Sequence, residues 1–135
     1  MERMVEEIYI SYLALPLANA EVAEKGKLAC IDTANNGVIV AGKAATGLIP
    51  IGLFMENLTG DGTTEVQIMF FREIRAVWWD NDSGTPVDST DRGQLCFILD
   101  DETVTMDGTG HSNAGMVLKV DATKGVLVHA DFKAW

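Results

Sequence analysis

The stretch Gly52–Phe71 reads GLFMENLTGDGTTEVQIMFF, and a second stretch with the same plan, residues 115–132, reads GMVLKVDATKGVLVHADF. Each stretch begins with a glycine and an apolar run, continues through a turn of small and polar residues, and ends in a second strand-like run. Strand-forming residues on both sides of turn residues are typical of a β-hairpin. The sequence therefore predicts two similar hairpins, one in each half of the chain.

The similarity continues upstream of both hairpins. Residues 26–32 read GKLACID and residues 93–100 read GQLCFILD. We therefore expect two related β units, residues 26–71 and 93–132, joined by a connector over 72–92. Two unrelated β-meanders with glycine turns would also look alike, and this alternative stays open.

Length and composition indicate one globular domain of the mainly β class. The chain has 135 residues, of which 47% are hydrophobic, with 13 glycines and 3 prolines, a composition that suits a turn-rich fold with a buried core. No sustained helical period of apolar residues is present. No apolar run approaches the roughly 20 residues of a membrane span, and the N-terminus lacks the pattern of a signal peptide. We expect synthesis in the cytoplasm.

The net charge of −10 narrows the class of partner. Contacts with phosphate groups require clustered Lys and Arg, so we expect neither a nucleic-acid partner nor an anionic membrane surface. The two cysteines, Cys30 and Cys96, lie at similar places in the two predicted units. Buried free thiols are the favoured interpretation for a cytoplasmic protein, and a disulfide between them stays open.

Local patterns predict several strands and turns of the first unit. Asn36-Gly37 is a hairpin signal, because both residues tolerate positive φ. Pro50 limits how its strand pairs, since proline has no N–H to donate. In the run 65–71, alternation places Val66, Ile68 and Phe70 on the core side.

The first 24 residues differ from the rest of the chain, because they carry many apolar residues and no glycine. We interpret residues 1–24 as an N-terminal arm that packs outside a single β domain formed by 25–135. An ordinary first strand in the domain's own sheet is an equal alternative. Either way, the apolar content indicates that the segment is held against something.

The connector carries adjacent tryptophans, Trp78 and Trp79. Neighbouring side chains on a strand point to opposite faces, so one should be buried and the other should lie at an edge or an interface. Asp80–Gly84 superficially resembles a calcium-binding loop, but its glycine and its final acidic ligand fall at the wrong positions, which favours a turn. Residues 100–102, Asp-Asp-Glu, are predicted to form a hairpin tip.

Catalytic and metal-binding patterns are thin. His111 lies in a Gly/Ser/Asn loop and His129 on the last predicted strand, and neither has neighbours at metal-ligand spacing. The sequence has no nucleophile elbow, no phosphate-binding glycine loop before a helix, and no Cys-x-x-Cys pair. We therefore expect no enzyme activity, no cofactor and no metal.

The glycine-led strands, the run AVWWDN at 76–81 and the closing run KGVLVHA together resemble the capsid decoration, or cement, proteins of tailed bacteriophages. The similarity covers roughly residues 26–132. This chain departs from the family in placing Trp-Trp-Asp before the second glycine-led strand. The resemblance implies a small β-barrel or tulip-like domain that binds the outside of the head as a homotrimer and bridges subunits of the major capsid protein.

If the resemblance holds, the interface residues should come from the arm and the connector: Tyr9, Tyr12, Leu13, Leu17, and one of Trp78 or Trp79. An extended arm can add a strand to a neighbouring sheet edge. Two other functions remain open. One is a different virion component, such as a tail-tube or neck subunit. The other is a small ligand-binding β-barrel, although the sequence offers no convergent set of polar groups for a pocket.

Overall fold

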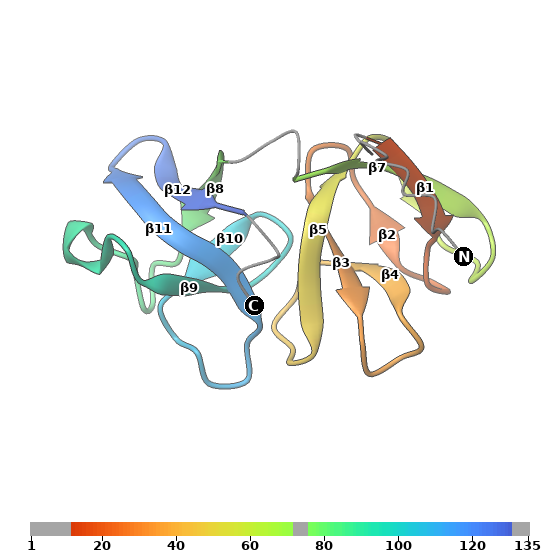
Figure 1. The fold of residues 1–135 in the computed structure, drawn as a ribbon, viewed down its shortest axis with the longest axis horizontal. Coiled ribbons are helices and arrows are strands. Elements are labelled where there is room, and N and C mark those ends of the chain that lie inside the picture. The colour runs from red at the N-terminus through yellow and green to blue at the C-terminus, as the bar shows by residue number, and fades with distance from the viewer. Residues whose placement is uncertain (1–11, 72–75, 131–135) are drawn as a thin grey trace, which may run out of the picture.

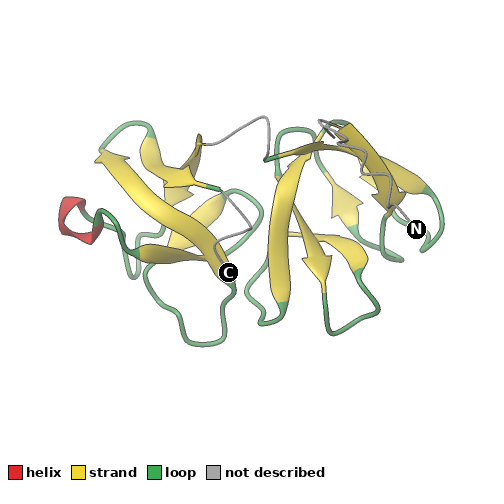
Figure 2. Cartoon of the chain, in the orientation of Figure 1, coloured by secondary structure: helices red, strands yellow, loops and turns green. Residues whose placement is uncertain are grey.

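The structure is a computed structural model that describes residues 12–71 and 76–130, and it is mainly β, as the sequence predicts. Figure 1 shows two groups of strands side by side, which we call the first unit (residues 12–71) and the second unit (residues 76–130). The described strands are β1 (Tyr12–Pro16), β2 (Val22–Ala23), β3 (Leu28–Asp32), β4 (Val38–Ala41), β5 (Leu48–Phe54), β6 (Leu58–Thr59), β7 (Glu65–Phe70), β8 (Ala76–Asn81), β9 (Leu95–Ile98), β10 (Thr103–Thr105), β11 (Asn113–Asp121) and β12 (Gly125–His129). A short 3-10 helix, η1 (Ser89–Asp91), lies in a loop of the second unit (Figure 2).

The two units have the same strand order. In the first unit the order is β1-β7-β5-β3-β4, and a parallel bridge between Leu17 and Ile39 joins β4 back to the end of β1. In the second unit the order is β8-β12-β11-β9-β10, and β10 pairs with β8 in parallel to close a barrel. All the other pairs in both units are antiparallel. The predicted repeat is therefore present in the topology.

The register of the strands matches residue by residue as well. Each unit has a β-bulge in the strand that follows its first hairpin, in β5 and in β11. The matched pairs around the bulges are Leu28–Leu53 with Leu95–Met116, Ala29–Gly52 with Cys96–Gly115, and Cys30–Pro50 with Phe97–Asn113. A bulge shifts the pairing of every later residue, so the same bulge at the same place is a specific likeness. It also shows that Cys96 corresponds to Ala29 and not to Cys30.

The glycine that opens each quoted stretch has a steric role. A Cβ on Gly52 would lie 2.1 Å from the carbonyl oxygen of Met69, and one on Gly115 would lie 2.4 Å from that of His129. Those oxygens belong to β7 and β12, the strands that pair with β5 and β11. Only glycine allows the two backbones to approach this closely.

The local predictions for the first unit are confirmed. Asn36 and Gly37 have φ values of 61° and 72° at the turn between β3 and β4. Val66 and Ile68 are buried and Phe70 packs against the same cluster. Pro50 pairs with β3 at a point that β7 does not reach, because β7 pairs with β5 only from Gly52 onward. The missing N–H of the proline therefore leaves no gap in the described ladder.

The limits of the two units differ from the sequence-based expectation. Residues 12–16 were assigned to an arm, but they form β1 and pair with β7. Val22–Ala23 likewise pairs with β6. Residues 76–81 were assigned to a connector, but they form β8, the first strand of the second unit. The described part of the N-terminal segment therefore forms a strand in the domain's own sheet, which was the alternative interpretation. Residues 1–11 lie outside the described residues.

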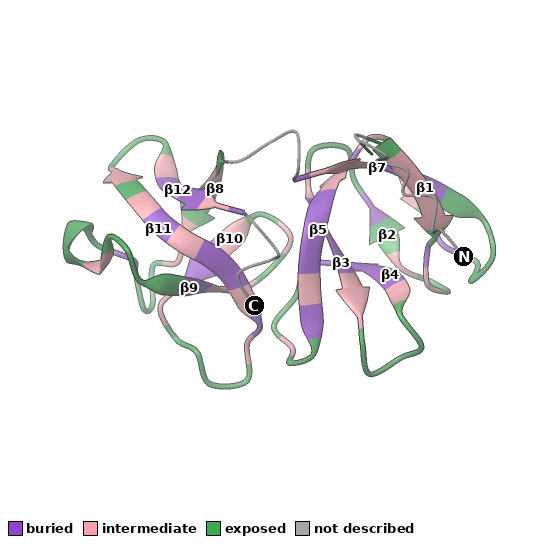
Figure 3. Cartoon of the chain, in the orientation of Figure 1, coloured by how far each residue is buried: buried purple, intermediate pink, exposed green. Residues whose placement is uncertain are grey.

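Two clusters of buried side chains hold the molecule together. One lies inside the first unit and includes Leu17, Phe54 and Ile68. The other fills the barrel of the second unit and also takes in Leu28 and Val40 from the first unit. Figure 3 shows buried positions along the strands of both units. Because the second cluster includes residues of both units, the units pack as one body.

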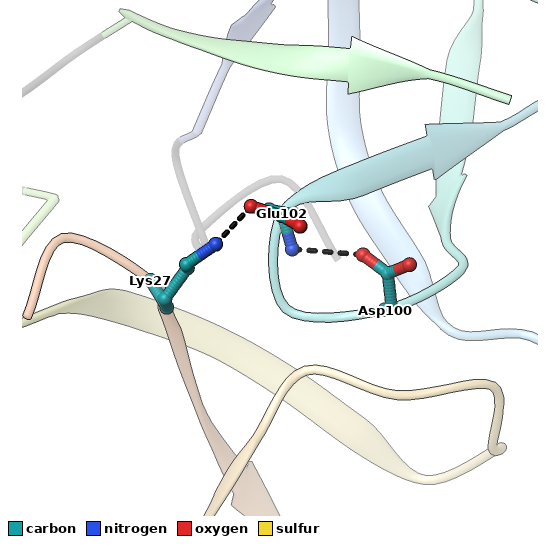
Figure 4. Close-up of polar contacts among 3 residues, drawn as sticks. All are labelled: Lys27, Asp100 and Glu102. Carbon is teal, nitrogen blue, oxygen red and sulfur yellow. Dashed lines mark hydrogen bonds and ion pairs between the residues drawn. The ribbon is translucent and has the colours of Figure 1, made fainter. Parts of the chain in front are cut away.

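Polar contacts fix the same junction. The N–H of Leu28 donates to the carbonyl oxygen of Asp101 at 2.9 Å, and Lys27 forms an ion pair with Glu102 (Figure 4). The buried hydroxyl of Ser112 accepts from the N–H of Leu48 at 3.0 Å and donates to the carbonyl oxygen of Ala45 at 2.6 Å. The predicted hairpin tip at residues 100–102 and the segment around Ser112 are thus two parts of the second unit that contact the first.

Candidate interaction surface

The N-terminal strand carries the most exposed aromatic residue that was predicted to bind a partner. Tyr12 lies at the start of β1 and is 56% exposed, whereas Leu13 is partly buried. Leu17, two positions before the turn that follows β1, is buried in the core of the first unit. Tyr9 lies outside the described residues. Of the three predicted interface residues of the arm that the structure describes (Tyr12, Leu13 and Leu17), Tyr12 is the one that is exposed to solvent.

The two tryptophans of β8 point to opposite sides, as alternation requires. Trp79 is buried in the core of the second unit. Trp78 is partly exposed, and the ammonium group of Lys124 lies 5.6 Å from the centre of its ring. This is a cation–π contact on the outside of the barrel. Trp78 is therefore the tryptophan available to a partner.

The two histidines do not come together in one site. His129 lies on β12 opposite Met116, and its side chain is partly exposed. The Nδ1 atom of His111 is buried and has no hydrogen-bond partner within the described residues. A catalytic base is normally held by a second group that fixes its orientation. Within the described residues, no group of three or more His, Cys, Asp or Glu side chains could hold a metal ion.

The loop that superficially resembles a calcium site is a hydrogen-bonded turn. The carboxylate of Asp82 accepts from the N–H groups of Gly84 at 2.9 Å and Thr85 at 3.1 Å, and from the hydroxyl of Thr105 at 2.9 Å. These bonds hold the pKa of Asp82 below its usual range, and His111 acts in the same direction. The carboxylate oxygens are therefore engaged by the protein itself, as expected for a turn.

Another acidic turn has the same construction. The carboxylate of Asp61 accepts from the N–H groups of Thr63 at 2.9 Å and Thr64 at 2.6 Å, and from both threonine hydroxyls. The bonds from Thr64 and Thr63 hold the pKa of Asp61 well below its usual range, because they favour the charged form. The turn between β6 and β7 is therefore fixed by one ionised side chain.

Both cysteines are free and buried, which agrees with the favoured interpretation. Burial raises the pKa of the Cys96 thiol to about 12 and raises that of Cys30 further. A thiol must lose its proton to act as a nucleophile. At neutral pH these side chains therefore behave as small apolar groups.

Sequence reasoning missed two exposed apolar residues. Val22 on β2 is 51% exposed and Leu95 at the start of β9 is 40% exposed. Leu95 is equivalent to Leu28, which is only 4% exposed because the second unit covers it. The signal in the sequence was the shared glycine-x-leucine at 26–28 and 93–95, but only the packing of the units shows which leucine is covered.

In the part of the chain that the structure describes, no helix is long and apolar enough to cross a membrane. Comparisons with protein-family models, with curated proteins and with solved structures found no match. The candidate contact residues therefore come from the geometry of this chain: Tyr12 on the first unit, and, on separate strands of the second unit, Trp78 and Leu95.

Proposed function

We propose that this protein decorates the outside of a tailed-bacteriophage head and stabilises the shell by bridging subunits of the major capsid protein. Such a protein acts mechanically: it needs a rigid body, exposed contact residues and a surface that stays soluble on the particle. Its location would be the virion exterior after synthesis in the host cytoplasm, with a homotrimer as its working form.

The observation that best supports the proposal is the position of Tyr12. Tyr12 is the first residue of β1, and one edge of β1 pairs with β7. On its other edge, within the described structure, the segment contacts β4 only through the bridge between Leu17 and Ile39. A strand edge with an exposed aromatic residue suits binding by strand addition, in which main-chain hydrogen bonds supply affinity and side chains supply specificity. Tyrosine is also a common anchor at protein interfaces.

Two further features support the same function. The doubled β body, with one buried cluster extending across both units, offers a rigid block between capsid subunits. The net charge of −10 favours solubility of a particle covered by many copies. Because the copies repeat over a lattice, weak individual contacts would sum to a large stabilisation of the shell.

Co-sedimentation with capsids that lack the protein tests the proposal. We expect the wild type to pellet with the shells, and the Tyr12→Ala variant to bind at least about tenfold more weakly, as for an interface residue worth about 1.4 kcal/mol or more. Val22→Ala is the matched control, because Val22 is also exposed and apolar but lies on β2. Removal of residues 1–11 tests the N-terminal segment while leaving β1 whole.

Two results would contradict the proposal. One is full-length protein that stays in the supernatant at every shell concentration. The other is purified protein that assembles by itself into stacked rings or tubes, which would favour a tail component. Equal binding of the shells by Tyr12→Ala and by the wild type would show that Tyr12 on β1 is not a contact residue.

A further inference from the structure

We propose that the outer face of the second unit around Leu95 binds the first unit of another copy of this chain, so that copies associate head to tail. We call this surface the Leu95 face and define it as Gln94, Leu95 and Met116. This inference does not rest on the proposed capsid function, because it is drawn from the way the two units of one chain pack together.

The equivalent face of the first unit shows what such a surface binds. Lys27, Leu28 and Leu53 correspond to Gln94, Leu95 and Met116 in the matched registers. Leu28 is 4% exposed, and both it and Leu53 pack in the cluster that fills the second unit. The N–H of Leu28 donates to the carbonyl oxygen of Asp101 at 2.9 Å. In the first unit, therefore, this face is covered by a hairpin tip and core residues of the neighbouring unit.

The same face of the second unit is left open. Leu95 is 40% exposed and Met116 is partly exposed. The two leucines have the same register and the same place in the strand order. Leu28 is therefore buried because a neighbouring unit covers it, and not because of its local structure. A unit of the same fold would cover Leu95 as the second unit covers Leu28.

The hairpin tip of the first unit has the reach and the charge to be that neighbour. Six residues separate Ile31 from Val38 in this tip, and four separate Ile98 from Thr103 in the tip that contacts the first unit. Residues 33–37 (TANNG), the outer part of this tip, are all exposed and uncharged. Asp32 at its base is partly buried, and its carboxylate accepts from the N–H of Ala34 at 3.1 Å. The acidic tip Asp-Asp-Glu meets a face that carries Lys27 (Figure 4), whereas the Leu95 face carries the neutral Gln94 in its place. Each tip therefore matches the charge of the face it would meet.

A contact of this kind is heterologous, since the tip of one copy meets the face of the next. Such contacts form a single ring if the rotation between copies closes, as in a homotrimer, and an open chain if it does not. Neither is the stacked ring or tube that would favour a tail component. The arrangement differs from a two-fold dimer, in which the same patch meets itself. This difference makes the proposal testable with variants that damage the two halves of the contact separately.

The experiment measures the mass of the full-length protein by sedimentation velocity over a range of concentrations. We expect association of the wild type, and loss of that association in Leu95→Asp, which damages the face, and in Ala34→Asp, which places a charge in the neutral tip. Val22→Asp is the control, because it adds the same charge at an exposed apolar residue on β2 and should associate like the wild type. Circular dichroism should show that all the variants are folded.

Mixing the two damaged proteins identifies the geometry. In a head-to-tail contact, the intact tip of Leu95→Asp can bind the intact face of Ala34→Asp, so the mixture should form dimers although each variant alone is monomeric. A wild type that stays monomeric up to high concentration, association that survives in Leu95→Asp, or a mixture that stays monomeric would each overturn the proposal. Capsid binding by a monomeric wild type would overturn it, and the proposed homotrimer with it, while leaving the proposed decoration of the head intact.

Discussion

Gly52 shows how a single residue can set the spacing between two strands. Its α-carbon lies so close to β7 that a methyl group would overlap the carbonyl oxygen of Met69 at 2.1 Å. A backbone oxygen within a paired strand cannot turn away as a side chain can. We therefore expect Gly52→Ala to lower the free energy of unfolding by about 3 kcal/mol or more, the range of severe single substitutions. Urea unfolding followed by tryptophan fluorescence would measure this loss.

Gly84→Ala is the matched control for this prediction. A Cβ at Gly84 would lie 3.5 Å from the nearest atom, a carboxylate oxygen of Asp82, which is ordinary contact. Its effect should stay within about 0.5 kcal/mol, as for surface substitutions generally. Equal stability of the two variants would contradict the steric role given to Gly52.

Asp61 makes the stability of one turn depend on pH. Hydrogen bonds from Thr64 and Thr63 hold its folded pKa below the unfolded value of about 3.9. A depressed folded pKa contributes stability that is present above the unfolded pKa and is lost as the pH falls through the folded pKa. We expect Asp61→Asn to reduce the slope of unfolding free energy against pH below about pH 4, measured by urea unfolding at several pH values.

Glu65→Gln is the control, because Glu65 is exposed and its side chain forms no hydrogen bond with the described residues. Asp82, Asp88 and Asp121 also have lowered pKa values and account for the slope that remains in Asp61→Asn. A pH profile of Asp61→Asn that coincides with the wild type would show that the turn does not depend on the ionised carboxylate.

At the scale of the element, β8 tests strand alternation with two adjacent and chemically identical side chains. Trp79 is buried among the core residues of the second unit, whereas Trp78 lies outside the barrel beside Lys124. We expect Trp79→Ala to destabilise the protein by about 3–5 kcal/mol through the cavity it leaves. Trp78→Ala should cost about 1 kcal/mol or less, the value of an exposed cation–π contact. Thermal and urea unfolding of the two variants would give the comparison.

Strands with a clear alternation could be predicted from the sequence, but the unit to which each first strand belongs could not. The run 65–71 alternates, and its predicted core side is confirmed: Val66 and Ile68 are buried, and Phe70 packs against the same cluster. By contrast, β1 reads YLALP, in which apolar residues occupy both faces, so an arm and a strand fitted equally well. The segment that forms β8 was expected to be a strand, but it has no glycine-led start, so it was assigned to the connector and not to the second unit. Both strands are fixed by pairing with distant segments, β7 and β12.

The candidate surface was harder to predict than the fold, because exposure depends on how the units pack. Leu17 looks like Leu13 in the sequence, yet it lies in the core, since the chain turns there to bridge Ile39. Leu95 looks like Leu28 in the sequence, yet it is exposed. The second unit covers Leu28, whereas no unit of the same chain covers Leu95 in the described structure. Trp78 and Trp79 could be separated as one inside and one outside, but the sequence did not say which.

For the whole molecule, the junction between the units decides whether they unfold together. Ser112 of the second unit satisfies two backbone groups of the first, the N–H of Leu48 and the carbonyl of Ala45. Ser112→Ala leaves the buried N–H of Leu48 and the partly buried carbonyl of Ala45 without their partner, which costs about 1–3 kcal/mol. Because one buried cluster includes residues of both units, we expect this loss to appear in both and not in the second unit alone.

Hydrogen exchange can locate that loss along the chain. In Ser112→Ala, the slowest amides of β3 in the first unit and of β11 in the second should exchange faster by a similar factor, since the slowest amides report global unfolding. Ser83→Ala, in an exposed loop of the second unit, should leave both sets unchanged. Faster exchange in β11 with β3 unaffected would show two independent folding units. The Leu95 face would then lose its main support, because a junction that does not couple the two units of one chain gives no reason to expect the same packing between copies.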